Sequence, residues 1–299
     1  MSLERLQGLV KKSTLTAHDV TMINQLTEVC ERYEQLHMRI DSMMLQYRSG
    51  YATNDFLYYE DDLLVGYLAV DDRGLQQNEL VGMVHPDYRQ RGIFRTLLNA
   101  AAEEGRARNV QEFVLVNEQS SRSGYAFLRS TEACLSESEH EMFLTRMPRR
   151  ESFDERLIVH KAEQLDIDDL VKVQSQSFND PEDATRNRIV QCIQHPDQTY
   201  FLAVFGDSDV GCHEPVGSFR LDSTDTFVGI YAFGVRPDYQ GRGYGRQILE
   251  DAIHIIRASS QKAIMLDVDV ENSRAIHLYR SCGFEIRTTY NYYVLELQK

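Results

Sequence analysis

The sequence predicts two tandem copies of one α/β (α+β) fold, each a mixed, mostly antiparallel twisted sheet flanked by helices. The 299 residues suggest two domains at about 150 residues each. The stretch 84–98 recurs at 235–249, an offset of 151 positions with eight identities in fifteen. Each copy ends an apolar strand, passes a turn and enters an amphipathic helix. A repeat this long indicates two copies of one fold, because solenoid repeats span about 20–50 residues.

Composition narrows the class of protein. Hydrophobic residues make up 42% and charged residues 26%, which is typical of globular domains with an apolar core. The net charge of −14 disfavours nucleic acid, whose binding requires clustered Lys and Arg. The five cysteines are scattered without a C-x-x-C pair, so we expect neither a disulfide framework nor a zinc site. No apolar run approaches 18 residues and no signal peptide is evident, so we expect a cytoplasmic protein without a membrane partner.

In the first copy, predicted as residues 1–150, one long helix precedes the strands. Apolar residues at three- and four-residue spacing predict a helix over 15–48, with Met43 and Met44 as core filler. The remaining elements that we expect are strands at 56–60, 63–70 and 79–84 with a hairpin turn at 71–74, a strand at 112–117, a short helix at 123–128 and a closing strand at 140–146.

The second copy, predicted as residues 151–299, follows a charged linker at 146–155. Pro237 ends the strand before the repeated stretch, because proline has no N–H for a strand ladder. Tyr290 and Tyr292 are expected on one face of the last strand, and Tyr293 and Leu295 on the other. The elements that we expect are strands at 157–160, 200–205, 216–221, 226–235, 263–269 and 284–297, helices at 165–174 and 184–193, the helix of the repeated stretch, and a helix after Asn272.

A glycine-rich turn lies between a strand and a helix in the second copy. The turn contains Gly241, Gly243 and Gly245, and the unpaired N–H groups of the helix that follows suit a phosphate. No Gly-Lys-Ser/Thr follows, and the spacing is not G-x-G-x-x-G, so the turn is neither a P-loop nor a dinucleotide fingerprint. We therefore expect an anion site of another kind, with local positive charge from Arg236, Arg242 and Arg246.

Two motifs of the second copy resemble those of the GCN5-related N-acetyltransferases (the GNAT superfamily). The series from Gln240 to Gly245 is similar to the family's R/Q-x-x-G-x-G/A, and the series from Asn272 to Phe284 is similar to N-x-x-A-x-x-L-Y-x-x-x-G-F. The resemblance implies two tandem GNAT folds with a splay between the two central strands of each, and acetyl-CoA as co-substrate. The coenzyme-binding residues implied are Val235, Gln240, Gly241, Arg242, Gly243, Tyr244, Gly245, Arg246 and Asn272.

The same resemblance implies roles in catalysis. The Phe233 backbone N–H would bind the thioester oxygen, the Val235 N–H the pantetheine arm, and Tyr279 would act as general acid toward the departing thiolate. The general base is unknown, because the strand 226–235 has no carboxylate; Tyr231, a bound water or Asp222 stays open. No metal site is expected, because the histidines are isolated.

The first copy departs from the family pattern. Arg89 and Gly92 are kept, but Phe94 replaces the last glycine, and the second motif has lost its Asn, its Tyr and its Gly-Phe ending. Phe127 stands about where the tyrosine belongs. We interpret this copy as degenerate, a scaffold or substrate wall rather than a second working site, in which the N–H groups of residues 91–95 would still offer a site for the coenzyme.

We therefore predict an acetyl-CoA-dependent N-acetyltransferase that acts on a primary amine of a small or cationic acceptor by direct attack in a ternary complex. An acidic surface attracts a cationic amine, and a polyamine, an aminoglycoside, an amino acid or a peptide N-terminus fits equally. Two alternatives stay open: a non-catalytic acyl-CoA sensor and an interaction protein. We expect a monomer or a homodimer.

Overall fold

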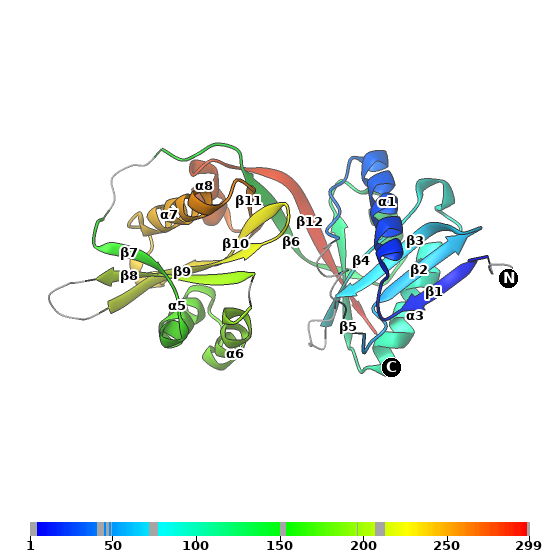
Figure 1. Cartoon of the computed structure of the whole chain (residues 1–299), viewed down its shortest axis with the longest axis horizontal. Coiled ribbons are helices and arrows are strands. Elements are labelled where there is room, and N and C mark those ends of the chain that lie inside the picture. Colours follow the sequence, from blue (N-terminus) through cyan, green and yellow to red (C-terminus); the bar gives the residue numbers. More distant parts are fainter. Residues whose placement is uncertain are drawn as a thin grey trace. The chain divides into compact units, whose positions relative to one another are not determined.

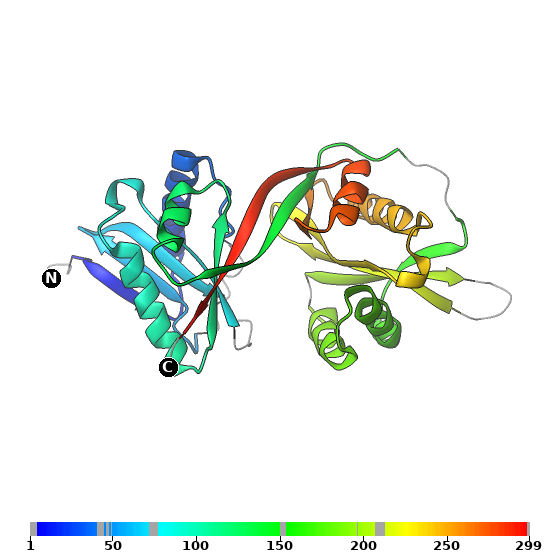
Figure 2. The ribbon, with the colours of Figure 1, turned by 180° about the vertical axis from the view of Figure 1, so that it is seen from behind.

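The computed structural model describes residues 5–40, 45, 48, 50–71, 77–149, 154–195, 197–206 and 213–297. The chain divides into two compact units (Figures 1 and 2). Unit 1 comprises Met1–Glu139 and Thr288–Lys299, and unit 2 comprises His140–Arg287. Each unit is a mixed α/β sheet with helices on its faces, as predicted.

The sheet of unit 1 is antiparallel except for one parallel pair, β4 with β5. Its strands, in spatial order, are β1 (Gly8–Lys12), β2 (Asp55–Glu60), β3 (Leu63–Asp71), β4 (Gln77–Val84), β5 (Glu112–Glu118) and residues 290–296 of β12 (Phe284–Glu296). The other elements are α1 (Ala17–Glu34), η1 (Pro86–Tyr88), α3 (Ile93–Ala107), α4 (Arg122–Leu128) and the first residues of β6 (Cys134–Leu144).

The sheet of unit 2 has the same plan, with β10 parallel to β11 and antiparallel to β9. Its strands, in spatial order, are β7 (Leu157–Lys161), β8 (Gln198–Gly206), β9 (His213–Ser223), β10 (Phe227–Val235), β11 (Ala263–Asp269) and the later residues of β6. The other elements are η2 (Gln164–Asp166), α5 (Ile167–Phe178), α6 (Glu182–Ile193), η3 (Pro237–Tyr239), α7 (Tyr244–Ser259) and α8 (Ser273–Ser281).

Helix α1 is shorter than the sequence predicts. It begins with a capping box, in which Thr16 and Asp19 each accept the other's backbone N–H. It ends at Glu34, because Gln35 takes the left-handed conformation and closes the last turn. The predicted helix over 15–48 is therefore wrong at residues 36–40, which are not helical, whereas Leu45 is helical. Met43, Met44 and most of the hairpin turn at 71–74 lie outside the described residues.

The closing strands differ from the prediction. The sequence predicts that residues 140–146 close the first sheet and residues 284–297 the second. In the structure, residues 290–296 of β12 pair with β5 of unit 1, and β6 from His140 onward belongs to unit 2. Alternation of apolar residues identifies a strand but not its partner. The division into residues 1–150 and 151–299 follows the sequence repeat and stays a prediction. The compact units of the structure are discontinuous in sequence.

Both faces of each sheet are covered. In unit 1, Tyr67, Ala69 and Met83 pack with α1, and the alternate residues Leu68 and Val70 pack with α3. In unit 2, α5 and α6 cover one face, and α7 and α8 cover the other. In each unit the sheet therefore lies between two layers of helices.

The two parallel strands of each unit separate part-way along their length. Pairing of β4 with β5 ends at Leu80 and Leu115, and pairing of β10 with β11 ends at Gly229 and Met265. Ala232 (φ 48°) forms a bulge in β10. This confirms the predicted splay, which leaves backbone groups of β4 and β10 unpaired with the neighbouring parallel strand.

No helix among the described residues is long and apolar enough to span a membrane.

Gly283 lies between α8 and β12 and provides a test of the fold. Its φ is +96°, and an added Cβ would lie 1.9 Å from the carbonyl oxygen of Arg146. Gly283→Ala should therefore lower the free energy of unfolding by about 3 kcal/mol or more in urea titrations. Gly8→Ala is the matched control: its φ is +77° with no atom within 4 Å, so we expect a loss of only about 1 kcal/mol. Equal losses would show that the contact with Arg146 is not tight.

Candidate functional site

The glycine-rich turn of unit 2 forms an open helix N-terminus. Gly241 and Gly243 have φ of +76° and +89°, which glycine adopts readily. Among the described residues no side chain caps α7, whose N-cap is Gly243, and no atom lies within 4 Å of an added Cβ there. Gln240 stabilises the turn, since its Nε2 donates to the Val235 carbonyl and its Oε1 accepts from Arg274. The first N–H groups of α7 can therefore donate hydrogen bonds to an anion.

The arginines around this turn are not equivalent. Arg236 is buried and donates to Gln176, Glu214 and the carbonyl of Pro215, so its charge is neutralised away from the turn. This differs from the expectation that Arg236 contributes to the anion site. Arg246 pairs with Glu250 at 2.9 Å and donates to the Ser281 carbonyl, whereas Arg242 lies over the Tyr239 ring. Basic character at the turn thus rests more on the backbone and on Arg242 than the sequence suggests.

Tyr279 is held beside the splay. It lies on α8, is 7% exposed, and its ring meets the Phe233 ring edge-on with centroids 6.1 Å apart. Burial raises the pKa of the Tyr279 hydroxyl well above its usual value, and the neighbouring Cys282 adds to the effect. The hydroxyl is therefore protonated at neutral pH and can donate a proton.

Backbone N–H groups of β10 point into the splay. The N–H of Arg236 donates to Val216 of β9. Because successive N–H groups of a strand alternate in direction, the Val235 N–H points to the opposite side, where β11 has separated from β10. Phe233 is two residues earlier, beside Tyr279. The structure thus brings together the predicted Phe233, Val235 and Tyr279.

Asn272 has the predicted capping role. Its Oδ1 accepts the N–H of Ala275 at the start of α8. Its contact with the pantetheine arm stays a prediction.

Asp222 is a poor candidate for the general base. Both of its carboxylate oxygens accept from Arg220, at 2.6 and 2.7 Å, so the anion is already stabilised by a bidentate pair. Arg220 also lies over the rings of Tyr200 and Tyr231. The Tyr231 hydroxyl lies 3.5 Å from the Met265 sulfur at the start of the splay. The sequence did not predict that Arg220 would pair with Asp222, because the alternation of residues along a strand does not show which charged side chains pair.

The first copy keeps the backbone of the turn. Gln90 and Gly92 have φ of +63° and +78°, like Gly241 and Gly243, and among the described residues no side chain caps α3. A non-glycine residue at Gln90 costs about 1–2 kcal/mol of strain. The N-terminal turn thus retains the geometry of an anion site.

The helix caps correct one residue assignment in the first copy. Ser121 caps α4 through the N–H of Gly124, and Asn272, 151 positions later, caps α8 in the same way. At this offset Leu128, not Phe127, occupies the position of Tyr279. The prediction that Phe127 replaces the tyrosine is therefore wrong by one residue, since the motif alone did not fix the alignment.

Unit 1 contains a cavity of about 570 Å³ that the sequence did not indicate. It lies at the splay of β4 and β5 and reaches the turn before α3, so its lining includes Gly82, Gln90, Gly92, Leu115 and Glu118. A cavity of this size accommodates a small organic ligand.

No group of three or more His, Cys, Asp or Glu side chains suited to a metal occurs in the part of the chain that the structure describes.

Comparisons with known proteins agree with the two-copy organisation. Residues 21–128 and 165–284 match the model of a family described as "Acetyltransferase (GNAT) family". A mycothiol acetyltransferase of Thermomonospora curvata is 25% identical over 299 residues, covering 93% of this chain and 94% of that protein.

Two solved structures share the fold over nearly the whole chain. A GCN5-related N-acetyltransferase from Sphaerobacter thermophilus has a TM-score of 0.79 at 19% identity, over 97% of this chain and 96% of that one. A tandem GNAT protein from the clavulanic acid biosynthesis pathway has a TM-score of 0.72 at 15% identity, over 97% and 98%. At these identities the likeness concerns the fold.

The buried hydroxyl of Tyr279 provides a test by pH. Its pKa is raised in the folded state, so the folding stability that it contributes is full below about pH 10 and is lost as pH rises above the unfolded value. The loss of stability between about pH 9 and 11 should be smaller for Tyr279→Phe than for the wild type, measured by urea unfolding. An identical pH dependence for Tyr279→Phe and the wild type would contradict the raised pKa.

Proposed function

The chain belongs to the acetyltransferase (GNAT) family, and from this premise we propose that unit 2 binds acetyl-CoA and transfers its acetyl group to a primary amine. Membership identifies the chain as an N-acetyltransferase of a family that uses acetyl-CoA. The observation that carries the assignment to unit 2 is the juxtaposition of Phe233, Val235 and Tyr279 at the splay, next to an uncapped helix N-terminus. Unit 1 has Leu128 in place of the tyrosine.

The proposed coenzyme site follows the open turn. The pyrophosphate would accept hydrogen bonds from the N–H groups at the start of α7. A side chain at Gly243 would enter the space proposed for it. The pantetheine arm would pass along β10, where the Val235 N–H is directed into the splay, and would approach Asn272 on α8. The residues proposed to contact the coenzyme are Val235, Gln240, Gly241, Arg242, Gly243, Tyr244, Gly245, Arg246 and Asn272.

The proposed reaction is direct acyl transfer in a ternary complex. The amine nitrogen attacks the thioester carbonyl, and the Phe233 N–H stabilises the oxyanion that forms. The carbon–sulfur bond then breaks, and Tyr279 donates its proton to the thiolate as CoA leaves. The amine loses one proton to a base, for which Tyr231 or a bound water is proposed. Asp222 is disfavoured by its pair with Arg220.

The acceptor is proposed to be a small molecule with a primary amine. The Thermomonospora curvata relative, aligned over 93% of this chain, is named "Mycothiol acetyltransferase". The net charge of −14 favours a cationic amine at the encounter stage. We propose a cytoplasmic monomer or homodimer with no nucleic acid or membrane partner.

An alternative proposal is an acyl-CoA sensor that retains the coenzyme site without turnover. The absence of a carboxylate between residues 226 and 235 supports it. Release of free thiol from acetyl-CoA with a panel of amines distinguishes the two: binding without thiol release for every amine favours the sensor. A chain that binds no coenzyme would leave only the interaction protein.

Tyr279→Phe tests the general acid. The ring remains to pack against Phe233, but no proton is available for the thiolate, so kcat should fall by about 10²-fold or more with little change in coenzyme affinity. Tyr293→Phe, in unit 1, should retain wild-type kcat. Wild-type kcat in Tyr279→Phe would exclude the proposed role.

Gly243→Glu tests the coenzyme turn. A side chain and a negative charge would occupy the place of the pyrophosphate, so acetyl-CoA binding to unit 2 and acetyl transfer should both be lost. Calorimetric titration and thiol release measure the two effects, and circular dichroism checks the fold. Unchanged transfer would refute the assigned turn.

A further inference from the structure

The cavity of unit 1 passes through the sheet. Leu80 and Val84 of its lining belong to the core on the α3 side, whereas Cys30 and Met83 belong to the core on the α1 side. Both sets reach one cavity because β4 and β5 no longer pair beyond Leu80. The splay thus joins a chamber under α1 to the turn before α3.

The end of the cavity near α3 suits an anion. Gln90, Gly92 and Arg95 line it, and among the described residues no side chain caps the helix. An added Cβ at Gly92 would meet no atom within 4 Å, so the first N–H groups of α3 are accessible.

The chamber under α1 is apolar. Its lining includes Leu36, Met38, Val81 and Met83, together with Cys30, whose pKa burial raises to about 11, so that the thiol is uncharged. A hydrocarbon chain gains free energy in such surroundings, whereas an amine would lose its hydration.

Unit 2 has polar side chains beside the residue that corresponds to Met83. Met83 corresponds to Gly234 at the 151-residue offset, and an added Cβ at Gly234 would lie 2.7 Å from the Cβ of Ser177 on α5. Buried polar atoms of Gln174, Ser177 and Ser218 have no hydrogen-bond partner among the described residues. The two splays therefore differ in the chemistry that they present on this face.

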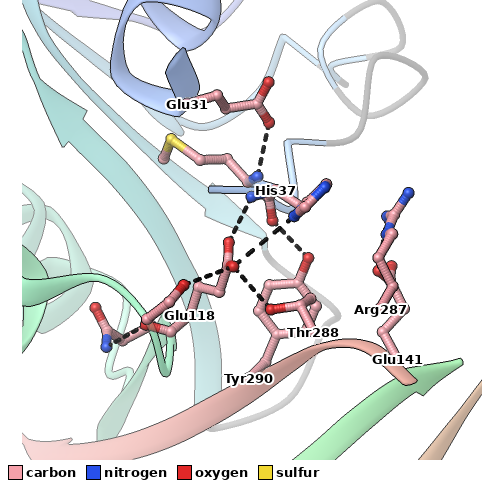
Figure 3. Close-up of polar contacts among 10 residues, drawn as sticks. Glu31, His37, Glu118, Glu141, Arg287, Thr288 and Tyr290 are labelled. Atoms are coloured by element: carbon pink, nitrogen blue, oxygen red, sulfur yellow. Dashed lines mark hydrogen bonds and ion pairs between the residues drawn. The ribbon is translucent and has the colours of Figure 1, made fainter. Parts of the chain in front are cut away.

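The Glu118 carboxylate, which lines the cavity, already has protein partners (Figure 3). The Glu118 carboxylate accepts from the His37 N–H and from the hydroxyls of Ser120 and Thr288. Tyr290 donates to the His37 carbonyl. These bonds fix residues 36–39 over the chamber. Among the arginines of the lining, Arg39 pairs with Glu139, Arg89 pairs with Glu34, and Arg95 donates to the Ser130 hydroxyl.

We propose that unit 1 binds a coenzyme A thioester whose acyl chain is longer than acetyl, with the phosphates at the turn before α3 and the acyl chain in the chamber under α1. The site does not transfer the chain, because Leu128 stands where Tyr279 supplies a proton in unit 2. The cavity volume of about 570 Å³ holds the pantetheine arm and acyl chain of such a ligand, and the nucleotide lies outside. This inference does not depend on catalysis by unit 2.

The experiment isolates unit 1 with the full chain carrying Gly243→Glu. Acetyl-CoA and hexanoyl-CoA, which has four more methylene groups, are titrated separately by calorimetry. Each buried methylene strengthens binding about fourfold, so one site per chain should bind hexanoyl-CoA at least about tenfold more tightly than acetyl-CoA. Gly92→Glu added to this chain should abolish the binding.

Val81→Phe tests the chamber itself. A phenyl ring in the chamber should remove the preference for hexanoyl-CoA while acetyl-CoA binding is kept, which also shows that the protein is folded. No binding to the Gly243→Glu chain, equal affinity for the two thioesters, or an undiminished preference in Val81→Phe would each overturn the proposal. Acetyl transfer by the wild type is measured separately, so that failure of the proposed function is distinguished from failure of this inference.

Discussion

In each unit the geometry of the candidate site depends on two parallel strands that stop pairing part-way along their length. These strands are β4 and β5 in unit 1 and β10 and β11 in unit 2. A backbone N–H inside a sheet normally has a carbonyl opposite it, and an unpaired one is costly when buried. Beyond Leu80 in β4 and Gly229 in β10 the neighbouring strand has moved away. The groups that are left unpaired with that strand are held in position by pairing of the same strands with their other neighbours. In β10 the bulge at Ala232 lies at this gap.

The two copies have used the gap differently. In unit 2 the aromatic ring at the splay comes from the strand, as Phe233, and the helix contributes Gly245. In unit 1 the strand contributes Gly82 and the helix contributes Phe94, whose ring packs on Phe127. Both copies have an aromatic ring at the splay, but the ring comes from the strand β10 in unit 2 and from the helix α3 in unit 1. This exchange, together with Leu128, distinguishes the transfer site that we propose for unit 2 from the binding site that we propose for unit 1.

Local features of this chain could be predicted from sequence, and long-range ones could not. The turn at Gly241 and Gly243 and the cap at Asn272 follow from residue chemistry over a few positions, and the structure confirms both. The partner of β12 depends on which strand edge is available, which alternation does not encode. The neutralisation of Arg236 by Glu214, 22 residues earlier, likewise requires the folded chain. The cavity of unit 1 is lined by residues from many separate segments, so no local sequence pattern predicts it.

The last strand has a consequence for how the protein is made. Residues 290–296 of β12 complete the edge of β5, and Tyr290 and Thr288 anchor the segment at His37. On the ribosome these residues emerge long after the rest of unit 1. Until residues 290–296 have been made, the earlier residues of unit 1 therefore expose the unpaired edge of β5, and such an edge can pair with another chain. A pause or truncation just before residue 288 would leave unit 1 without this strand, although all the residues of unit 2 would already have been made.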